Sequence, residues 1–166
     1  MGAEAPQHGW KMIFPFDAAR RALLLRLLLT FAALNFVWEV LQLPLYTIWW
    51  NSSPGANVFA VLHCAAGDLI IGSGAFFTAI IIAGRGWPDD RAARLRVAIV
   101  LTLLGLGYTV YSEWLNVAVR ATWAYTDLMP RVPLLSIGLA PLLQWLLLPP
   151  LALWLATRNV ASNKIR

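Results

Sequence analysis

The sequence predicts an all-α integral membrane protein, a bundle of four transmembrane helices forming a single domain over residues 1–166. Of the 166 residues, 60% are hydrophobic and only 13% are charged. The mean hydropathy of +0.66 lies outside the usual range of soluble globular proteins. Four apolar segments are long enough to cross a hydrocarbon core of about 30 Å, which takes roughly 20 helical residues. Basic residues stand mainly at the ends of these segments.

Local breaks in the apolar pattern separate the four spans. Pro44 is expected to stop or kink the first span. The stretch 51–55, Asn-Ser-Ser-Pro-Gly, predicts a turn before the second, and the polar stretch 84–94 predicts a loop before the third. Pro149 and Pro150 are expected to kink the fourth span within the bilayer. The predicted spans are residues 23–43, 56–83, 97–119 and 138–156.

The distribution of positive charge predicts the orientation of the chain, because cytoplasmic loops of membrane proteins are enriched in Lys and Arg. Both termini are therefore expected in the cytoplasm, with residues 157–166 as a cytoplasmic tail. Arg outnumbers Lys by 11 to 2, which favours a bacterial protein and hence the inner membrane. The 11 basic residues predicted on the cytoplasmic side are Lys11, Arg20, Arg21, Arg26, Arg85, Arg91, Arg94, Arg96, Arg158, Lys164 and Arg166, against Arg120 and Arg131 on the other side.

The first 22 residues are expected to form a cytoplasmic interfacial segment. No clear small-x-small site for a signal peptidase follows the first apolar run. Aromatic and apolar side chains alternate here with basic ones, a pattern typical of a segment that lies at the membrane surface. The residues concerned are Trp10, Lys11, Ile13, Phe14, Phe16 and Arg20.

Composition and charge placement exclude nucleic-acid binding and any site built from several cysteines. The net charge of +5 suggests nucleic-acid binding, but the basic residues are separated by long apolar spans and make no continuous patch for a phosphate backbone. Cys64 is the single cysteine, so the chain has no intramolecular disulfide and no multi-cysteine zinc site.

Three acidic residues, Glu39, Asp68 and Glu113, lie inside the predicted spans. Each costs about 2.5 to 3.5 kcal/mol at a bilayer centre, so such residues face one another, water or a ligand. At about 1.5 Å of rise per residue, Glu39 and Glu113 fall at a similar depth, in the outer half of the membrane. His63 and Gln144 fall at that depth too. Asp68 lies about 140° around its helix from His63 and is expected to face another neighbour or the cavity floor.

Helical phase gathers further polar residues near these carboxyl groups. Asn35, Glu39 and Gln42 share one stripe at i, i+4 and i+7. Amide side chains in such stripes also serve as interhelical hydrogen bonds, at about 0.6 kcal/mol each, so a purely structural role stays open. A simple ion pair within the stripe of the third span is a further structural alternative. That stripe contains Thr109, Glu113, Asn116 and Arg120, and its ion pair would join Glu113 to Arg120.

Aromatic residues cluster toward the predicted outer side. Trp49, Trp50, Trp123 and Tyr125 are best explained as an aromatic belt at the membrane surface. Trp38, Trp114 and Trp145 lie deeper, where they either line a pocket or simply pack. The proline-containing stretch 122–137 is either a helix connection or a lid over the cavity.

The leading functional hypothesis is acid–base chemistry on a lipophilic, isoprenoid-like substrate. A low-dielectric cavity favours the uncharged forms of carboxyl and imidazole groups, which suits proton transfer near neutral pH. Glu39 and Glu113 would protonate and deprotonate, His63 would relay protons, and tryptophans would stabilise a cationic intermediate. Residues 35–39, Asn-Phe-Val-Trp-Glu, resemble a motif of integral-membrane terpene cyclases. The resemblance covers five residues of one helix, in a chain with fewer spans than those enzymes.

Two alternatives remain. Glu39, His63 and Glu113, with Cys64 and Asp68, include donors that suit iron, manganese or zinc. Only one histidine lies within the spans, however, and the Glu-x-x-His motif of di-iron bundles is absent, so no cofactor is identified. The other alternative is a non-catalytic accessory subunit of a larger membrane complex, or a small carrier, although no inverted repeat supports transport.

The expected partners are membrane lipids, a lipophilic ligand, and either other proteins or further copies of the chain. The candidate catalytic residues are Glu39, His63, Glu113 and Asp68. The candidate ligand-binding or supporting residues are Asn35, Gln42, Asn116, Gln144, Trp38, Trp114 and Trp145.

Overall fold

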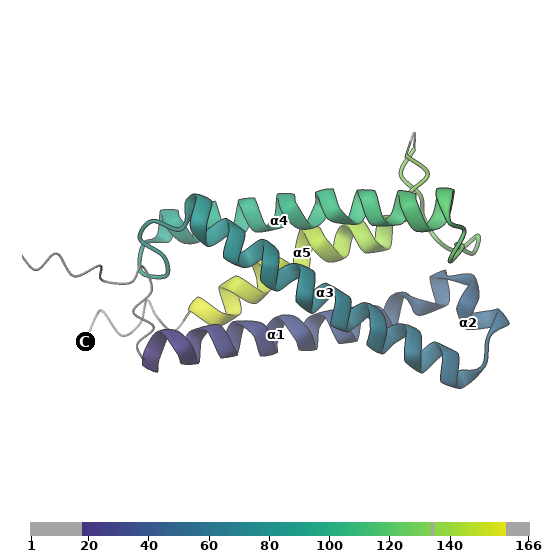
Figure 1. Cartoon of the computed structure of the whole chain (residues 1–166), viewed down its shortest axis with the longest axis horizontal. Helices are drawn as coiled ribbons and strands as arrows, with labels where there is room; N and C mark the ends of the chain where they lie inside the picture. Colours follow the sequence, from purple (N-terminus) through teal and green to yellow (C-terminus); the bar gives the residue numbers. More distant parts are fainter. Residues whose placement is uncertain (1–17, 134, 159–166) are drawn as a thin grey trace, which may run out of the picture.

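The computed structural model describes residues 18–133 and 135–158. Within them, four helices are long and apolar enough to cross a membrane (Figure 1). The predicted all-α bundle with four membrane-spanning helices is therefore confirmed. The predicted surface anchor around Trp10 and most of the predicted tail lie outside the described residues. The four helices are α1 (Ala18–Gln42), α3 (Pro54–Ala83), α4 (Arg91–Glu113) and α5 (Leu139–Thr157).

The first span ends where Pro44 was expected to end it. α1 stops at Gln42, and the next three residues form a 3-10 turn, η1 (Leu43–Leu45), that contains Pro44. A short helix, α2 (Thr47–Asn51), follows at the end of the bundle. The chain therefore turns into α3 through two small helical pieces rather than through a simple loop.

Capping side chains fix the starts of the two middle helices. The backbone N–H of Ala56 donates to Ser53 Oγ, with 3.3 Å between N and Oγ, at the start of α3. At the start of α4, the Asp90 carboxylate accepts from the backbone N–H of Ala92 at 3.1 Å and of Ala93 at 3.0 Å. α4 thus begins earlier than predicted, because hydropathy does not register a polar, capped first turn.

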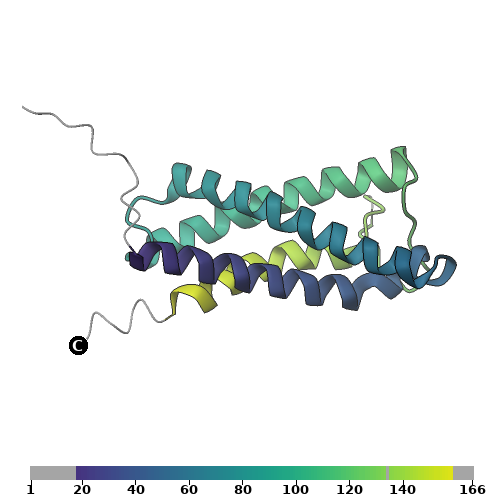
Figure 2. The ribbon, with the colours of Figure 1, turned by 60° about the horizontal axis from the view of Figure 1, so that its bottom comes forward.

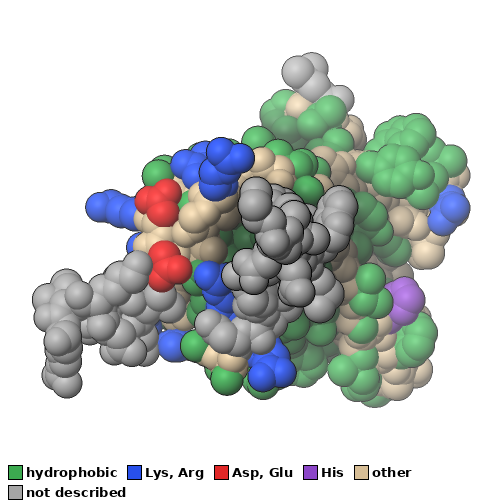
Figure 3. Space-filling view, turned by 60° about the vertical axis from the view of Figure 1, so that its left-hand side comes forward, with side chains coloured by type: hydrophobic (Ala, Val, Ile, Leu, Met, Phe, Trp, Pro, Cys, Tyr) green, Lys and Arg blue, Asp and Glu red, His purple; other side chains and the backbone are tan. Residues whose placement is uncertain are grey.

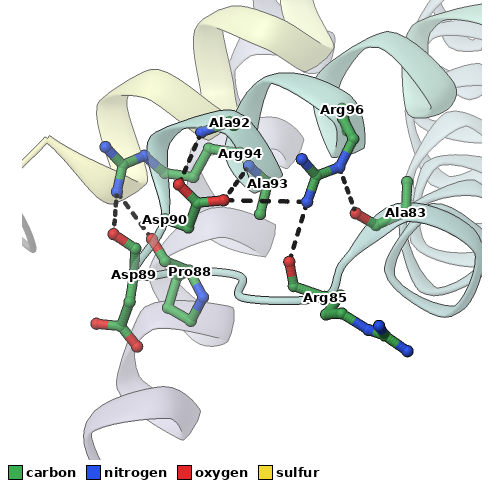
Figure 4. Close-up of polar contacts among 9 residues, drawn as sticks. All are labelled: Ala83, Arg85, Pro88, Asp89, Asp90, Ala92, Ala93, Arg94 and Arg96. Carbon is green, nitrogen blue, oxygen red and sulfur yellow. Dashed lines mark hydrogen bonds and ion pairs between the residues drawn. The ribbon is translucent and has the colours of Figure 1, made fainter.

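Arginine side chains close the connection between α3 and α4 (Figure 4). Arg94 Nη1 donates to the Pro88 carbonyl oxygen at 2.8 Å, and Arg96 Nη2 donates to the Arg85 carbonyl oxygen at 3.0 Å. Arg96 Nη2 also lies 3.9 Å from Asp90 Oδ2 in an exposed ion pair. The loop carbonyls are thereby satisfied by side chains from the first turns of α4.

α4 continues as a π-helical segment, η2 (Trp114–Val119), so that the third span reaches Val119. The backbone N–H of Arg120 donates to the Leu115 carbonyl oxygen at 2.8 Å, the i→i−5 spacing of a π-helix. Such segments recur at functional sites. Nothing in the hydropathy pattern predicts this one, since α- and π-helical turns bury the same residue types.

The last span, α5, carries Pro149 and Pro150 inside it. Each proline removes a backbone N–H from the helical ladder, and its ring crowds the preceding turn. The ribbon of α5 changes direction part-way along its length, as the sequence predicts (Figure 1).

The helices alternate in direction and surround a common core. α1 packs against α3 and α5, and α4 packs against the same two helices. The order around the bundle is therefore α1, α3, α4, α5, with α1 diagonal to α4 (Figure 2). The start of α1, the α3–α4 loop and the end of α5 share one end of the molecule (Figure 1). Lys and Arg side chains gather at that end, which we call the basic end (Figure 3).

An apolar core extends from the middle of the bundle toward the basic end. Phe31 and Trp145 meet edge to face, with ring centroids 5.9 Å apart. Glycines make room for both rings, because a Cβ at Gly72 would collide with Phe31 and one at Gly105 would collide with Trp145. Other members of this core are Leu23, Leu27, Phe76, Ala79, Val97, Leu101, Leu148, Ala152, Leu153 and Ala156.

Candidate functional site

A cavity of about 430 Å³ lies among the four long helices, toward the end of the bundle opposite the basic end. Residues of η1, α2, η2 and the connection from η2 to α5 also line it. Residues distant in sequence meet there, because antiparallel helices bring the halves that lie far from the basic end to one level. The four candidate catalytic residues all line it: Glu39 from α1, His63 and Asp68 from α3, and Glu113 from α4.

Gln144 of α5 joins the carboxyl groups of α1 and α3. Its Nε2 atom lies 2.7 Å from Asp68 Oδ2, 3.1 Å from Glu39 Oε1 and 2.9 Å from Asn35 Oδ1. The amide has two hydrogens for these three acceptors. The Glu39 and Asp68 carboxyl groups therefore meet at one amide nitrogen. Two negative charges at one amide in a low-dielectric interior would repel each other, so we expect this pair to hold one proton between its two carboxyl groups.

Gln42 supports the same cluster from α1. Its Nε2 donates to Glu39 Oε1 at 2.8 Å and to Gln144 Oε1 at 3.1 Å. Its own Oε1 accepts from Trp38 Nε1 at 3.2 Å. Trp38 therefore orients an amide of the cluster and is not part of the cavity wall. Four of the residues predicted to support the site, Trp38, Gln42, Gln144 and Asn35, thus form one hydrogen-bonded chain.

Glu113 belongs to a second polar group, on the α4 side of the cavity. Its carboxylate accepts a hydrogen bond from the Tyr125 hydroxyl, which in turn accepts from the backbone N–H of Gly138 at 3.0 Å. Burial and the bond to Glu113 raise the pKa of Tyr125, so its hydroxyl keeps its proton and stays a donor. Among the described residues no ion pair joins Glu113 to Arg120, which lines the cavity and is exposed.

Tyr125 was assigned from sequence to the aromatic belt, but it is only 7% exposed. The connection that carries it folds back and bonds to the segment after α1. The backbone N–H of Thr47 donates to the Ala124 carbonyl oxygen, and that of Thr126 to the Leu45 carbonyl oxygen, each at 2.9 Å. Backbone pairing of this kind leaves no trace in hydropathy, which is why the burial of Tyr125 was missed.

His63 stands at the rim of the cavity rather than at its centre. Its ring is exposed and stacks on Phe59, with centroids 5.5 Å apart. Asp68 instead accepts a hydrogen bond from Gln144, the amide that also bonds to Glu39. The angular separation of His63 and Asp68 along α3 explains this, since the face that turns Asp68 inward turns His63 toward the surface.

Of the remaining candidate residues, some line the cavity and one lies on the outside of the bundle. Trp145 is buried and lines the cavity, as does Asn116, whose Nδ2 donates to the Ser112 carbonyl oxygen at 2.9 Å. Trp114 is 52% exposed and lies on the outer surface, away from the cavity. Trp114 directly follows Glu113, and a one-residue step turns a side chain by about 100° around a helix.

Sequence reasoning also missed part of the α4 wall. Tyr108 and Ser112 line the cavity together with Asn116 and Arg120. These four residues follow a spacing of four, so periodicity was a usable signal for them. Tyr46 lines the cavity as well, but it lies beyond the end of α1, where helical phase gives no guidance.

The donors of the cavity do not form a ready metal site. Within residues 18–133 and 135–158, no three His, Cys, Asp or Glu side chains are placed to hold one metal ion. His63 is turned to the rim, and Glu113 is engaged by Tyr125.

The chain matches no protein-family model, no curated protein and no solved structure. Its function therefore has to be inferred from the contacts within the cavity. The decisive features are the paired carboxyl groups of Glu39 and Asp68, the Glu113–Tyr125 contact and the mixed polar and apolar wall.

Proposed function

We propose that this protein is an enzyme of the bacterial inner membrane that binds a lipophilic, isoprenoid-like molecule in its cavity and transfers protons to and from it. The observation that carries the proposal is the Glu39–Asp68 pair, held by the Gln144 amide inside a membrane-spanning bundle. Intramembrane ionisable groups that pair inside a bundle mark functional sites by default.

The size and wall of the cavity support a lipophilic ligand. Its volume of about 430 Å³ falls in the range of small-molecule sites. Apolar side chains, among them Leu43, Ile71 and Trp145, make up much of its wall. A few convergent polar groups within an apolar wall are typical of a site that orients one reactive part of an apolar molecule.

The two polar groups suit the two halves of an acid–base reaction. The proton shared by Glu39 and Asp68 is available for transfer to a substrate carbon or oxygen, and the remaining negative charge is held by the Gln144 and Gln42 amides. The Glu113 carboxylate then accepts a proton from the substrate, while Tyr125 orients it. The cycle closes when that proton returns to the Glu39–Asp68 pair, so the reaction is an isomerisation or cyclisation without net oxidation.

Aromatic surfaces supply the remaining element of this chemistry. Trp145 lines the cavity beside Gln144. Protonation of an isoprenoid double bond creates a cation, and aromatic faces stabilise cations within about 6 Å of the ring centroid. His63, at the rim, is placed to exchange protons with the exterior rather than with the substrate.

The proposed orientation puts the basic end in the cytoplasm and the cavity in the outer half of the membrane. The support is the positive-inside rule, because the described basic residues concentrate at one end of the bundle (Figure 3). Arg120 and Arg131 are the described exceptions, at the opposite end.

Native mass spectrometry of protein gently extracted from its host's membranes tests the proposal. Wild type is expected to retain a small apolar molecule, and Glu39→Gln and Glu113→Gln are expected to lose it. Asp127→Asn is the matched control, since it makes the same change at an exposed carboxyl group away from the cavity. It should retain the molecule as wild type does.

Other outcomes would contradict the proposal. A retained metal ion, lost in the Glu39 and Glu113 variants, would support the metal alternative. A chain without a small molecule, bound to other protein subunits and indifferent to all three substitutions, would support the accessory role.

A further inference from the structure

The cavity lies between the outer halves of α3 and α4. Those two helices are close at the basic end and separate toward the other end (Figures 1 and 2). In that region α3 contributes Gly67 and His63 to the wall, and α4 contributes Tyr108 and Ser112. The cavity therefore lies where α3 and α4 separate from each other.

The cavity reaches the molecular surface along this line. His63 is exposed, and Tyr108 is 42% exposed, although both line the cavity. A Cβ added at Gly67 would meet no atom within 4 Å. On the opposite side, between α1 and α5, the wall is closed, since Gln42 is buried and Gln144 is only 2% exposed.

This opening lies at the level of the lipid hydrocarbon. Gly67 is 13 residues from the first residue of α3, Pro54, which corresponds to about 20 Å along the helix. The surrounding surface is apolar, with exposed Leu62 and Ile70 on α3 and Leu104 on α4. A molecule that passes between α3 and α4 therefore comes from the membrane interior.

Among the described residues that line the cavity, one buried hydroxyl group has no hydrogen-bond partner. Thr109 is 4% exposed and lines the cavity beside Glu113, one turn away on α4. Its Oγ1 has no hydrogen-bond partner among the described residues. A threonine within a helix usually donates to the carbonyl oxygen four residues before it, as Thr78 does to Gly74 at 2.8 Å. An unpaired buried hydroxyl costs free energy unless a ligand satisfies it.

We infer that the cavity takes its ligand sideways from the membrane, through an entrance between α3 and α4 bordered by Gly67. The ligand is an uncharged lipid whose hydroxyl or carbonyl oxygen bonds to Thr109. A charged head group is disfavoured, because its passage through hydrocarbon is costly. This inference deepens the proposed function and rests on it for the existence of a ligand.

Dicyclohexylcarbodiimide, which dissolves in lipid, tests the entrance. A protonated carboxyl group adds to it, so that the carboxyl oxygen bonds to the central carbon, the proton goes to nitrogen, and the protein gains the whole reagent mass. The target is the Glu39–Asp68 pair, which the proposed function expects to hold a proton. With wild type in lipid nanodiscs, modification at this pair is expected, whereas the cationic water-soluble carbodiimide should react far more slowly.

Two glycine variants provide the matched comparison. Gly67→Phe is expected to slow the modification at least several-fold, because its ring fills the entrance. Gly74→Phe places the same ring on the same helix, also with no atom within 4 Å of the added Cβ, but away from the cavity. It should react as wild type does. Equal rates for the two variants, an unmodified wild type, or equally fast reaction of the water-soluble reagent would overturn the side entrance.

Farnesol, an uncharged isoprenoid alcohol, tests the ligand class in the same assay. Farnesol is expected to protect the Glu39–Asp68 pair from dicyclohexylcarbodiimide in wild type and in Thr109→Ser. In Thr109→Val the protection should be about five-fold weaker, because loss of one hydrogen bond typically lowers the affinity by about that factor. Equal protection in all three would overturn the role of Thr109. No protection of wild type would overturn the ligand class while leaving the entrance standing. Failure of the proposed function would be recognised separately, in the native mass spectra of wild type, Glu39→Gln and Glu113→Gln.

Discussion

Gln144 shows how one side chain organises the polar half of this bundle. Its amide donates to acceptors on α1 and α3 and accepts from Gln42, so three helices meet at one group. In a membrane no bulk water is present to replace these bonds. Gln144 was predicted only as a supporting residue at the right depth, since depth does not tell which acceptors an amide will meet.

Replacement of Gln144 by leucine, which has a similar size, is expected to destabilise the protein. Glu39, Asp68 and Asn35 each lose a donor, and a buried polar group without a partner costs about 1 to 3 kcal/mol. The free energy of unfolding, measured by denaturant titration in detergent, should fall by at least that amount. Thr78→Val is the control, because Thr78 is exposed and bonds only within α3. Equal stability of the two variants would contradict the role of Gln144.

At the scale of helices, one face of α4 packs closely against α5, whereas another face has open space beside it. Gly105 faces the buried Trp145 ring, whereas Gly107 has no atom within 4 Å of an added Cβ. The same helix also ends in the π-helical segment η2, directly after Glu113. Apolar periodicity predicted the existence of this helix, but neither its capped start nor its π-helical end.

Gly105→Ala is expected to lower the melting temperature of the protein in detergent. The new methyl group collides with Trp145, and overpacking of a core costs about 1 to 3 kcal/mol. Gly107→Ala, two residues away, should leave the melting temperature unchanged or raise it, because alanine favours a helix over glycine by up to about 1 kcal/mol. A Gly105→Ala variant that melts with or above Gly107→Ala would show that α4 and α5 do not pack as described.

At the scale of the whole molecule, successive long helices run in opposite directions and the basic residues collect at one end (Figures 1 and 3). The orientation proposed from this asymmetry has a direct test, because Cys64 is the single cysteine and its removal gives a cysteine-free background. Ser52, before α3, and Arg91, at the start of α4, are both exposed and lie at opposite ends of the bundle.

In a Cys64→Ala background, Ser52→Cys is expected to react with a membrane-impermeant maleimide added to intact cells. Arg91→Cys should react only after the cells are opened, because the positive-inside rule places its loop in the cytoplasm. Labelling is read as a mass shift on a gel. The reverse pattern would invert the proposed orientation and place the cavity in the cytoplasmic half of the membrane.

The sequence by itself determined the four spans and the residues that stand out within them. Hydrocarbon thickness imposes length and hydropathy on each helix separately, so these features are local. The same reasoning picked out Glu39, Asp68 and Glu113, because an acidic residue in such a span is costly wherever its partners lie. Helical phase also indicated that Asp68 and His63 face different ways.

Only the tertiary structure decided which groups meet. The order of the helices around the bundle made Gln144 the neighbour of Asp68, 76 positions away in the chain. The backfolded connection brought Tyr125 to Glu113, and the separation of α3 from α4 opened the cavity beside Gly67. Depth and phase describe one helix at a time, whereas a hydrogen bond between helices depends on the choice of neighbour. That choice is set by the packing of small residues such as Gly105 against large ones such as Trp145, which no single span encodes.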